Sequence, residues 1–378
     1  MRVLFSGGGT GGHVYPSLAI AQALLAGPPL GDVPAGRGAE SHKVLYAGNP
    51  NGVERELVGR AGLPFVPVDS GQLRGNAPWT AASHLWRIRR GVRQARRWLR
   101  EFEPDVVFVT GAYVTVPVAL AARLERIPLL VYLPDLMPGL AVRWLSRLAQ
   151  KVAVSFEPAA RYFPGKAVVT GYPVRAELRA AAADRAGARR RLGLQADRPV
   201  LLVMGGSHGA RSINRAICQG LSELLKQVQL VHVTGRLDWS WVQWEAEKLP
   251  ASLRSDYHLY PYLHEELPDA LAAADLMVNR AGASNLGELP TVGLPAVLVP
   301  YPYAGRHQYV NAAFLANHGA ARLLEDRDLE QCLLPTVLGL LNDPVARQRM
   351  AQAARALARE DAVPRMIQLM AEMVRASQ

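Results

Sequence analysis

The sequence predicts an α/β protein built from two Rossmann-like, doubly wound parallel-sheet domains that face a central cleft. Short runs of β-branched and other apolar residues alternate with longer Ala/Leu/Arg-rich segments of helical period. This alternation is typical of parallel sheets that are covered by helices on both faces. The strand runs form two groups separated by the basic stretch 175–197, and each group opens on a strand that runs into glycines. We therefore expect ligands to bind at the carboxyl ends of the strands.

The order of the predicted elements supports this division into two domains. The strands of the first group are expected at residues 3–5, 43–47, 106–109 and 129–132. Those of the second group are expected at 200–204, 230–233, 276–278 and 296–299. Helices are expected over 16–25 and 212–225, directly after the two glycine turns.

The predicted domains are residues 1–165 and 166–350, followed by a C-terminal helix over 351–378. The tail 344–378 contains no glycine and has an amphipathic helical pattern. An amphipathic helix needs a partner for its apolar face. We expect this tail to pack back on the first domain.

Composition limits the possible functions. The 378 residues include 43 Lys plus Arg against 32 Asp plus Glu, a net charge of +11, and 49% are hydrophobic. That hydrophobic content supports a large core and excludes intrinsic disorder. The positive charge indicates an anionic partner such as a phosphorylated substrate, a nucleic acid or an anionic membrane surface. The chain has no helix-turn-helix, zinc-ligand or aromatic RNA-binding signature, so we expect no nucleic acid.

Cysteine content and hydropathy indicate a cytoplasmic protein that does not cross a membrane. Cys218 and Cys332 are the only cysteines, which excludes a disulfide framework and a cysteine metal site. The uncharged stretch 106–122 is interrupted by Gly111 and Pro117, and the uncharged stretch 289–304 contains four prolines. The N-terminal apolar run ends at the first glycine and is too short for a signal peptide.

The two glycine turns are candidate phosphate-binding loops. Closely spaced glycines let backbone N–H groups approach an oxyanion, and the helix that follows contributes its positive dipole end. Gly7, Gly9 and Gly12 also match the dinucleotide fingerprint, but the second strand ends at residues 46–50 without the acidic residue that binds a ribose. NAD binding is therefore disfavoured. Glycines that merely permit tight strand–helix packing remain the structural alternative, although two loops in matching positions favour phosphate binding.

His13 closes the first glycine loop and is a candidate general base. The unperturbed pKa of histidine lies near working pH, which suits proton transfer beside an anion-binding turn. The alternative is an ordinary polar surface residue.

A third polar segment follows the strand at 276–278. Glu288 lies in the predicted helix after the glycine turn at 279–284, where its carboxylate could accept hydrogen bonds from ribose hydroxyls. Gln308 and Asn311 are three residues apart, so they share a helix face on which paired amides could bind sugar hydroxyls. A helix cap with ordinary polar surface residues is the alternative.

Four motifs occur in order at residues 8–13, 205–211, 280–288 and 308–312. Together they resemble the MurG family of peptidoglycan N-acetylglucosaminyltransferases, which convert lipid I into lipid II, and the similarity covers nearly the whole chain. The resemblance implies an inverting GT-B glycosyltransferase that transfers N-acetylglucosamine from UDP-N-acetylglucosamine. It also implies that no metal ion and no cofactor take part in the catalytic step.

The resemblance also implies roles for individual residues. His13 would take the proton from the C4 hydroxyl of the MurNAc-pentapeptide carried on undecaprenyl pyrophosphate. The donor-binding residues would be Arg175, Ser207, Ala283, Ser284, Glu288, Gln308, Asn311 and Asp135. The residues that bind the acceptor diphosphate would be Thr10, Gly11, Gly12, Gly111 and Tyr113.

Several positions depart from the family pattern around the expected sugar pocket and acceptor loop. Residues 132–135 read Tyr-Leu-Pro-Asp where the family has His-Glu-Gln-Asn, so Asp135 takes the place of the asparagine. His307 replaces a glutamine, and Ala112 replaces the second glycine of Gly-Gly-Tyr. The alternative functions are therefore a related GT-B transferase that uses a UDP-sugar on another glycolipid or metabolite, and a non-enzymatic homologue that binds UDP-sugar.

The stretch 74–100 is rich in arginine and tryptophan and is a candidate membrane-binding surface. A basic amphipathic helix with tryptophans suits an anionic bilayer surface. The residues expected to contact the membrane are Trp79, Trp86, Arg87 and Arg90. We therefore expect a peripheral protein on the cytoplasmic face of the cell membrane. The alternative is a solvated basic face whose apolar side packs on the sheet.

Overall fold

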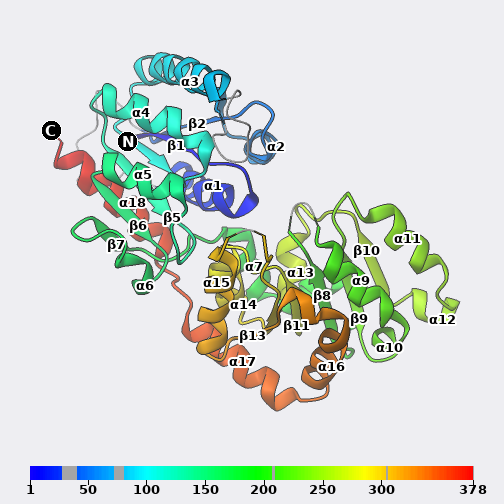
Figure 1. Cartoon of the computed structure of the whole chain (residues 1–378). Coiled ribbons are helices and arrows are strands. Elements are labelled where there is room, and N and C mark those ends of the chain that lie inside the picture. Colours follow the sequence, from blue (N-terminus) through cyan, green and yellow to red (C-terminus); the bar gives the residue numbers. More distant parts are fainter. Residues whose placement is uncertain (28–40, 72–80, 207–208, 304, 378) are drawn as a thin grey trace. The chain divides into compact units, whose positions relative to one another are not determined.

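The computed structural model describes residues 1–27, 41–71, 81–206, 209–303 and 305–377. The chain forms two compact units, Met1–Arg175 with Glu360–Gln378, and Ala176–Arg359 (Figure 1). The first unit thus extends to Arg175, past the boundary expected at residue 165.

The first unit is built on a seven-stranded parallel sheet with strand order β3-β2-β1-β4-β5-β6-β7. Its strands are β1 (Arg2–Ser6), β2 (Lys43–Gly48), β3 (Phe65–Pro67), β4 (Val106–Val109), β5 (Leu129–Leu133), β6 (Lys151–Val154) and β7 (Ala167–Val169). Helices cover both faces, so the central strands are apolar throughout, and all four residues of β4 are completely buried. The strand order reverses between β1 and β4, where Ser6 pairs with Val109. This is the topological switch point at which doubly wound sheets bind ligands.

Two groups of helices enclose this sheet. Their bounds are α1 (Gly11–Ala26), α2 (Val53–Arg60), α3 (Ala81–Phe102), η3 (Tyr113–Thr115), α4 (Val116–Leu124), α5 (Leu140–Leu148), α6 (Glu157–Ala160) and α18 (Ala362–Arg375). Helix α18, red in Figure 1, belongs to this unit although it ends the chain. Its Met366 and Met370 are completely buried in the same core cluster as Ile20 and Leu24 of α1.

The second unit repeats the plan with a six-stranded parallel sheet of order β10-β9-β8-β11-β12-β13. Its strands are β8 (Val200–Met204), β9 (Gln229–Val233), β10 (Tyr257–Tyr260), β11 (Leu276–Asn279), β12 (Ala296–Leu298) and β13 (Ala321–Leu323). The order reverses between β8 and β11, and Asn279 pairs with Met204 there. Each unit therefore has one switch point formed by two neighbouring parallel strands.

The helices of the second unit are shorter than the sequence suggests. They are α7 (Ala176–Ala183), α8 (Arg185–Arg191), α9 (Arg211–Gln219), α10 (Leu221–Leu225), α11 (Trp239–Glu247), α12 (Ala251–Arg254), α13 (Leu267–Ala273), α14 (Asn285–Val292), α15 (His307–Asn317), η4 (Asp326–Asp328), α16 (Leu329–Leu341) and α17 (Pro344–Ala356). The helix expected over 212–225 is interrupted at Gly220, and the expected C-terminal helix is divided between α17 and α18. Across the part of the chain that the structure describes, no helix is both long and apolar enough to span a bilayer.

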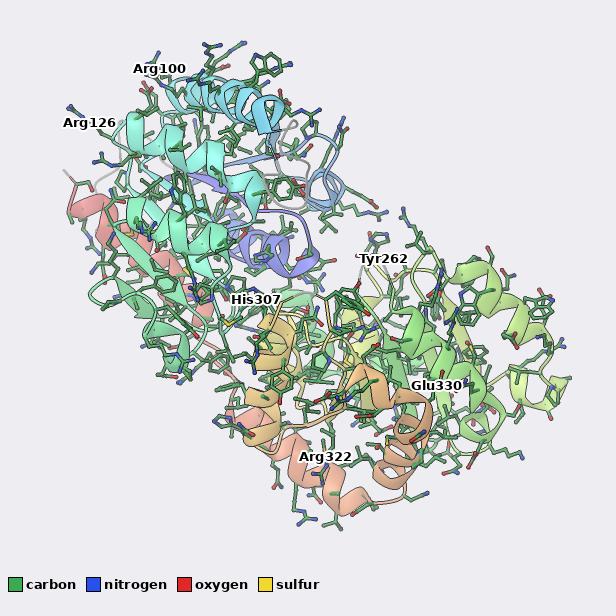
Figure 2. The ribbon with its side chains drawn as sticks, viewed as in Figure 1. Arg100, Arg126, Tyr262, His307, Arg322 and Glu330 are labelled. Carbon is green, nitrogen blue, oxygen red and sulfur yellow. The ribbon has the colours of Figure 1, made fainter. Side chains whose placement is uncertain are left out.

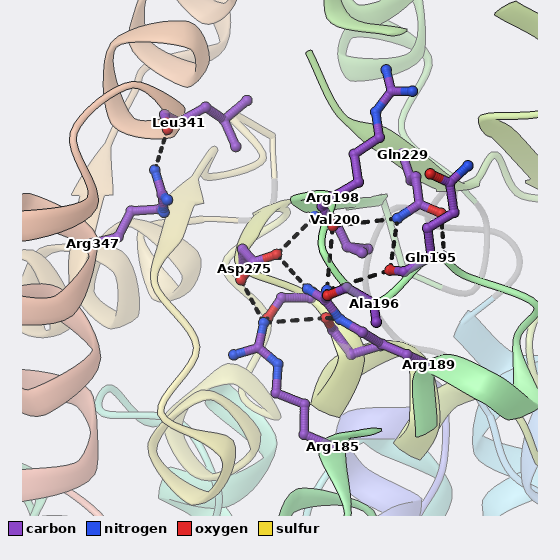
Figure 3. Close-up of polar contacts among 12 residues, drawn as sticks. Arg185, Arg189, Gln195, Ala196, Arg198, Val200, Gln229, Asp275, Leu341 and Arg347 are labelled. Carbon is purple, nitrogen blue, oxygen red and sulfur yellow. Dashed lines mark hydrogen bonds and ion pairs between the residues drawn. The ribbon is translucent and has the colours of Figure 1, made fainter. Parts of the chain in front are cut away.

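Arg189 on α8 fixes the amino-terminal ends of two central strands of the second sheet, on the side away from the switch point (Figure 3). Its guanidinium donates hydrogen bonds to the carboxylate of Asp275 at 2.7 Å and to the carbonyl of Ala196 at 2.6 Å. Asp275 also accepts from the N–H of Val200, the first residue of β8, at 2.7 Å. This partly buried ion pair joins α8 to the starts of β8 and β11.

We predict that Arg189→Ala lowers the free energy of unfolding by about 2 kcal/mol, because it removes one of the two guanidinium partners of Asp275 and the donor to the Ala196 carbonyl, while Arg185 still pairs with Asp275. Urea denaturation of the purified variant measures this loss. Arg190→Ala is the matched control, since Arg190 is exposed on the same helix, and its effect should stay within about 0.5 kcal/mol. Equal effects of the two substitutions would contradict the anchoring role.

Candidate functional site

The first glycine loop joins β1 to α1 at the switch point of the first unit. Helix α1 begins at Gly11, earlier than the expected residue 16, so Gly11, Gly12 and His13 form its first turn. Thr10 precedes the helix in an extended conformation and is exposed. N–H groups in a first helical turn have no partner within the helix, and the helix dipole adds positive potential. The expected diphosphate-binding residues Thr10, Gly11 and Gly12 are thus brought together at one helix N-terminus.

Neighbouring elements hold this loop in place. The phenol of Tyr46 on β2 donates to the carbonyl of Gly7 at 2.9 Å. Burial is the main cause that raises the pKa of Tyr46, and the nearby Glu54 carboxylate raises it further. Tyr46 therefore stays protonated and remains a donor to the loop.

Thr110, at the end of β4, contacts His13 twice. Its hydroxyl donates to the backbone carbonyl of His13 at 2.7 Å, and its own carbonyl lies 2.9 Å from Nδ1 of the His13 ring. A carbonyl oxygen can only accept a hydrogen bond, so we assign the proton of the neutral ring to Nδ1. Nε2 then carries the lone pair, which is the arrangement that a general base requires.

The sequence interpretation gave Thr110 no role. The signal in the sequence was that Thr110 is a polar residue at the end of an otherwise apolar strand. That strand pairs with the strand that leads into the glycine loop. Recognising it would have required the pairing of β1 with β4.

The second loop of this switch point contains Gly111, Ala112 and Tyr113. Gly111 has φ of 89°, and a β-carbon there would lie 2.5 Å from Cγ2 of Val142. Ala112 also has a positive φ, 64° with ψ of 163°, a region that is nearly restricted to glycine. Backbone geometry therefore favours the glycine that the family has at position 112. In this chain the same backbone conformation is strained, because the residue is an alanine.

Tyr132, which departs from the family pattern, is a core residue. Its side chain is completely buried, and its hydroxyl lies 2.8 Å from Oγ of Ser155 and 3.3 Å from the carbonyl of Gly171. Leu133 and Pro134 are also buried, whereas Asp135 is partly exposed. Among residues 132–135, only Asp135 is therefore accessible to a substrate.

Arg175 belongs to the first unit, although the sequence assigned it to the donor-binding domain. Its guanidinium stacks on the ring of Tyr15 of α1, 4.2 Å from the ring centroid. The nearby Tyr172 donates to the carbonyl of Gly12 at 3.2 Å. Both contacts place the segment 171–175 against the start of α1.

The second unit has an equivalent pair of loops, 205–210 after β8 and 280–284 after β11. Ser207, expected to bind the donor diphosphate, lies outside the described residues. The buried Arg280 joins the loop after β11 to the first turn of α9 and to η4, because its guanidinium donates to Oγ of Ser212 at 2.7 Å and to Asp326 at 2.5 Å. Arg280 lies within one of the sequence motifs, but the sequence alone did not indicate this linking role.

Ala283, Ser284 and Glu288 lie together where loop 280–284 leads into α14. Ser284 immediately precedes the helix, and Glu288 is in its first turn, where its N–H donates to the Ser284 carbonyl at 2.8 Å. A carboxylate is favoured at a helix N-terminus. Ser284 and Glu288 are partly exposed, as contact with a donor requires.

The amides of Gln308 and Asn311 on α15 bind backbone groups. Oε1 of Gln308 accepts from the N–H of Tyr301 at 2.8 Å, and Nδ2 of Asn311 donates to the carbonyl of Ala281 at 3.2 Å. Asn311 is completely buried, and its side chain fixes loop 280–284 through this bond. Gln308 remains partly exposed.

A buried polar network lies beneath the loop after β8. Nδ2 of Asn214 donates to the carbonyl of Thr234 and to Asp238, each at 2.9 Å, so its Oδ1 is left to accept from Nε2 of His232 at 3.0 Å. Nδ1 of His232 then accepts from the hydroxyl of Tyr257 at 2.8 Å. Complete burial lowers the pKa of His232 from 6.5 to about 3, and the attraction of Asp238 opposes this shift only partly.

The basic helix α3 has one buried face and one exposed face. Ala95 and Leu99 pack in the core, whereas Trp86 is 59% exposed. The guanidinium of Arg90 lies 5.6 Å from the ring of Trp86, and Arg87 is also exposed. Arg100, labelled in Figure 2, is another exposed arginine of this helix, and its guanidinium pairs with Glu125 at 3.1 Å. Trp79 lies outside the described residues.

No cluster of three or more His, Cys, Asp or Glu side chains that could hold a metal ion occurs within the described ranges. At each switch point, the structure instead provides a glycine turn followed by a helix N-terminus. Phosphate groups bind at such termini.

Two parallel Rossmann-like sheets, each with a glycine turn and a helix N-terminus at its switch point, form the GT-B fold, and the family matches place the chain among the glycosyltransferases with this fold. Residues 3–154 match the glycosyltransferase family 28 N-terminal domain, and residues 200–366 match the family 28 C-terminal domain. The chain belongs to glycosyltransferase family 28.

Similar proteins agree with this assignment. The chain is 42% identical to a protein of Roseiflexus sp. (strain RS-1) over 99% of this chain and 95% of that protein. It is 40% identical to a protein of Desulforudis audaxviator over 99% and 98% of the two chains. Both relatives are named UDP-N-acetylglucosamine–N-acetylmuramyl-(pentapeptide) pyrophosphoryl-undecaprenol N-acetylglucosamine transferase.

Solved structures also match over the full length. The crystal structure of Acinetobacter baumannii MurG has a TM-score of 0.71 at 27% identity, covering 98% of this chain and 99% of that one. A UDP-GlcNAc 2-epimerase from Neisseria meningitidis has a TM-score of 0.66 at 15% identity, covering 97% and 99%, and shares the fold alone.

We predict that His232 makes stability depend on pH. The folded-state pKa of about 3 lies below the ordinary 6.5, so the unfolded chain binds more protons between these values. Stability should therefore fall as pH drops below about 6.5, with a contribution approaching about 1.4 kcal/mol per pH unit. Urea denaturation between pH 7.5 and pH 4.5, in roughly half-unit steps, measures this slope.

The matched comparison uses His232→Gln and His318→Gln, since His318 is exposed on the surface of the same unit. The slope should become shallower in His232→Gln and stay unchanged in His318→Gln. An unchanged slope in His232→Gln would show that this histidine does not titrate as its burial requires.

Proposed function

We propose that this protein transfers N-acetylglucosamine from UDP-N-acetylglucosamine to the C4 hydroxyl of the MurNAc-pentapeptide of undecaprenyl-pyrophosphoryl lipid I, which gives lipid II for peptidoglycan synthesis. The observation that carries the proposal is the full-length similarity, at 42% identity, to a relative named for this reaction. In cells, the same reaction would serve cell-wall biogenesis, cell shape and cell division.

The first unit supplies the base and the acceptor site. First-turn N–H groups of α1 and the loop 111–113 hold the acceptor diphosphate. Nε2 of His13 removes the proton from the C4 hydroxyl as its oxygen attacks the anomeric carbon of the donor. The bond from that carbon to the UDP oxygen breaks, and the single displacement inverts the anomeric centre. Hydrogen bonding of Nδ1–H to the Thr110 carbonyl orients the ring and stabilises the imidazolium that forms.

The second unit supplies the donor site. Glu288 accepts hydrogen bonds from the ribose hydroxyls, while Ala283 and Ser284 line the sugar pocket. Asn311 holds the loop that carries these residues, and Gln308 adds a partly exposed amide. Ser207 is assigned to the donor diphosphate, and Asp135 to the sugar, by resemblance to the family.

We propose that the catalytic step uses no metal ion and no cofactor. UDP-N-acetylglucosamine is a substrate of the reaction and does not count as a cofactor. The negative charge that develops on departing UDP is stabilised by helix N-termini and by the guanidinium of Arg175. These groups are preorganised, because Arg175 already stacks on Tyr15.

We also propose peripheral association with the anionic cytoplasmic face of the cell membrane. The supporting feature is the exposed face of α3, where Trp86 supplies an interfacial aromatic ring and Arg87 supplies positive charge, while Arg90 lies over the Trp86 ring and also pairs with Asp69 at 2.9 Å. Each arginine near such a surface contributes about 1 kcal/mol.

The direct test measures UDP release by the purified protein given UDP-N-acetylglucosamine and a lipid I analogue. Release should depend on the acceptor and should fall to background with the donor alone. UDP-glucose, UDP-galactose and UDP-N-acetylgalactosamine serve as matched donors. Acceptor-dependent release with one of these instead, or none with lipid I, would assign the protein to another reaction of the GT-B class.

Two substitutions should separate catalysis from donor binding. His13→Ala should abolish turnover and leave UDP-N-acetylglucosamine affinity nearly intact, because the base contacts the acceptor hydroxyl. Glu288→Ala should weaken donor binding by roughly 1–3 kcal/mol through loss of a charged hydrogen-bond partner. Calorimetric titration and turnover assays distinguish the effects, and normal turnover by His13→Ala would refute its role as the base.

A further inference from the structure

Glu54 is a buried carboxylate beneath the first glycine loop that the proposed reaction does not use. It lies in the first turn of α2 and is completely buried. Its Oε1 accepts from the N–H of Asn49 at 3.0 Å, and its Oε2 accepts a long contact from the N–H of Gly9 at 3.4 Å. The side chain thus connects the end of β2 with the middle of the loop.

Three glycines from separate segments make room for this carboxylate. A β-carbon would lie 2.5 Å from Cδ of Glu54 if placed on Gly8, 2.8 Å from its Cγ on Gly48, and 2.4 Å from its Cδ on Gly52. Real β-carbons essentially never approach so closely. The glycine loop, the end of β2 and the start of α2 are therefore all packed against one acidic side chain.

Placing a carboxylate there is costly unless its oxygens are hydrogen-bonded. The two backbone N–H groups and the positive end of α2 offset that cost in the folded arrangement. A loop that moves away from Glu54 loses the Gly9 contact, so the side chain favours one loop conformation.

We propose that Glu54 is a positioning residue of the acceptor site. It holds Gly8 and Gly9 so that the first-turn N–H groups of α1 are aimed at the acceptor diphosphate, and it does not touch the substrate itself. The identity of the acceptor rests on the proposed function, whereas the contact between Glu54 and the loop does not.

Whether neutralising Glu54 weakens or tightens acceptor binding distinguishes a positioning role from a purely electrostatic one. A buried negative charge close to a diphosphate site repels the ligand. If charge alone mattered, neutralising Glu54 would tighten acceptor binding. If positioning dominates, the same change weakens it.

The first test is Glu54→Gln, which keeps the shape but turns one N–H acceptor into a donor. We expect the KM for a lipid I analogue to rise roughly tenfold or more, because a small misplacement of binding groups is costly. UDP-N-acetylglucosamine affinity, measured by calorimetry, should change less than about twofold. Glu56→Gln is the control, since Glu56 is exposed on the same helix.

The second test displaces the carboxylate without altering it. Gly52→Ala introduces a β-carbon against Glu54, whereas Gly59→Ala places one in open space on the same helix. The acceptor KM should rise in Gly52→Ala and stay at the wild-type value in Gly59→Ala. This pair keeps the proposal testable if Glu54→Gln fails to fold.

Amide hydrogen exchange of the peptide over residues 7–13, measured without substrate, gives a readout independent of activity. Exchange should be faster in Glu54→Gln and Gly52→Ala than in the two controls. Unchanged exchange, or an acceptor KM that is unchanged or lower, overturns the positioning role. A wild-type protein without acceptor-dependent turnover would refute the proposed function, while the exchange data would still decide whether Glu54 holds the loop.

Discussion

The parallel pairing of β1 with β4, and of β8 with β11, is the constraint on which both halves of the site depend. In each pair the strands leave the sheet at the same level, Ser6 beside Val109 and Asn279 beside Met204. The loops that follow are therefore adjacent although they are far apart in the sequence. The hydrogen bonds between Thr110 and His13 are possible only because of this pairing.

Sequence reasoning predicted the features that depend on local pattern. The apolar strand runs, the glycine turns and the presence of a helix after each turn follow from residue type and spacing, and the two-sheet α/β fold is confirmed. That Ala283, Ser284 and Glu288 lie close together likewise follows from local pattern, because they occupy one turn and the helix that follows it. The exact residue at which a helix starts could not be predicted, since α1 begins within the glycine motif itself.

The direction in which a side chain points could not be predicted in the same way. Tyr132 departs from the family pattern, yet it is buried against Ser155, and the amide of Asn311 turns to a backbone carbonyl. Arg175 was assigned to the second domain but stacks on Tyr15 in the first unit. Each outcome depends on tertiary neighbours that are distant in the sequence, so spacing alone contains no signal for it.

The first unit is discontinuous in sequence, because α18 completes a core that β1 and α1 begin. During synthesis on a ribosome, every core residue of the second unit, which ends at Arg359, is translated before α18. The first unit must wait with part of its apolar surface uncovered until Met366 and Met370 emerge. The half that is translated first therefore cannot complete its core until the other half has been translated, and a chain that stops after α17 lacks the helix that closes its earliest-made half.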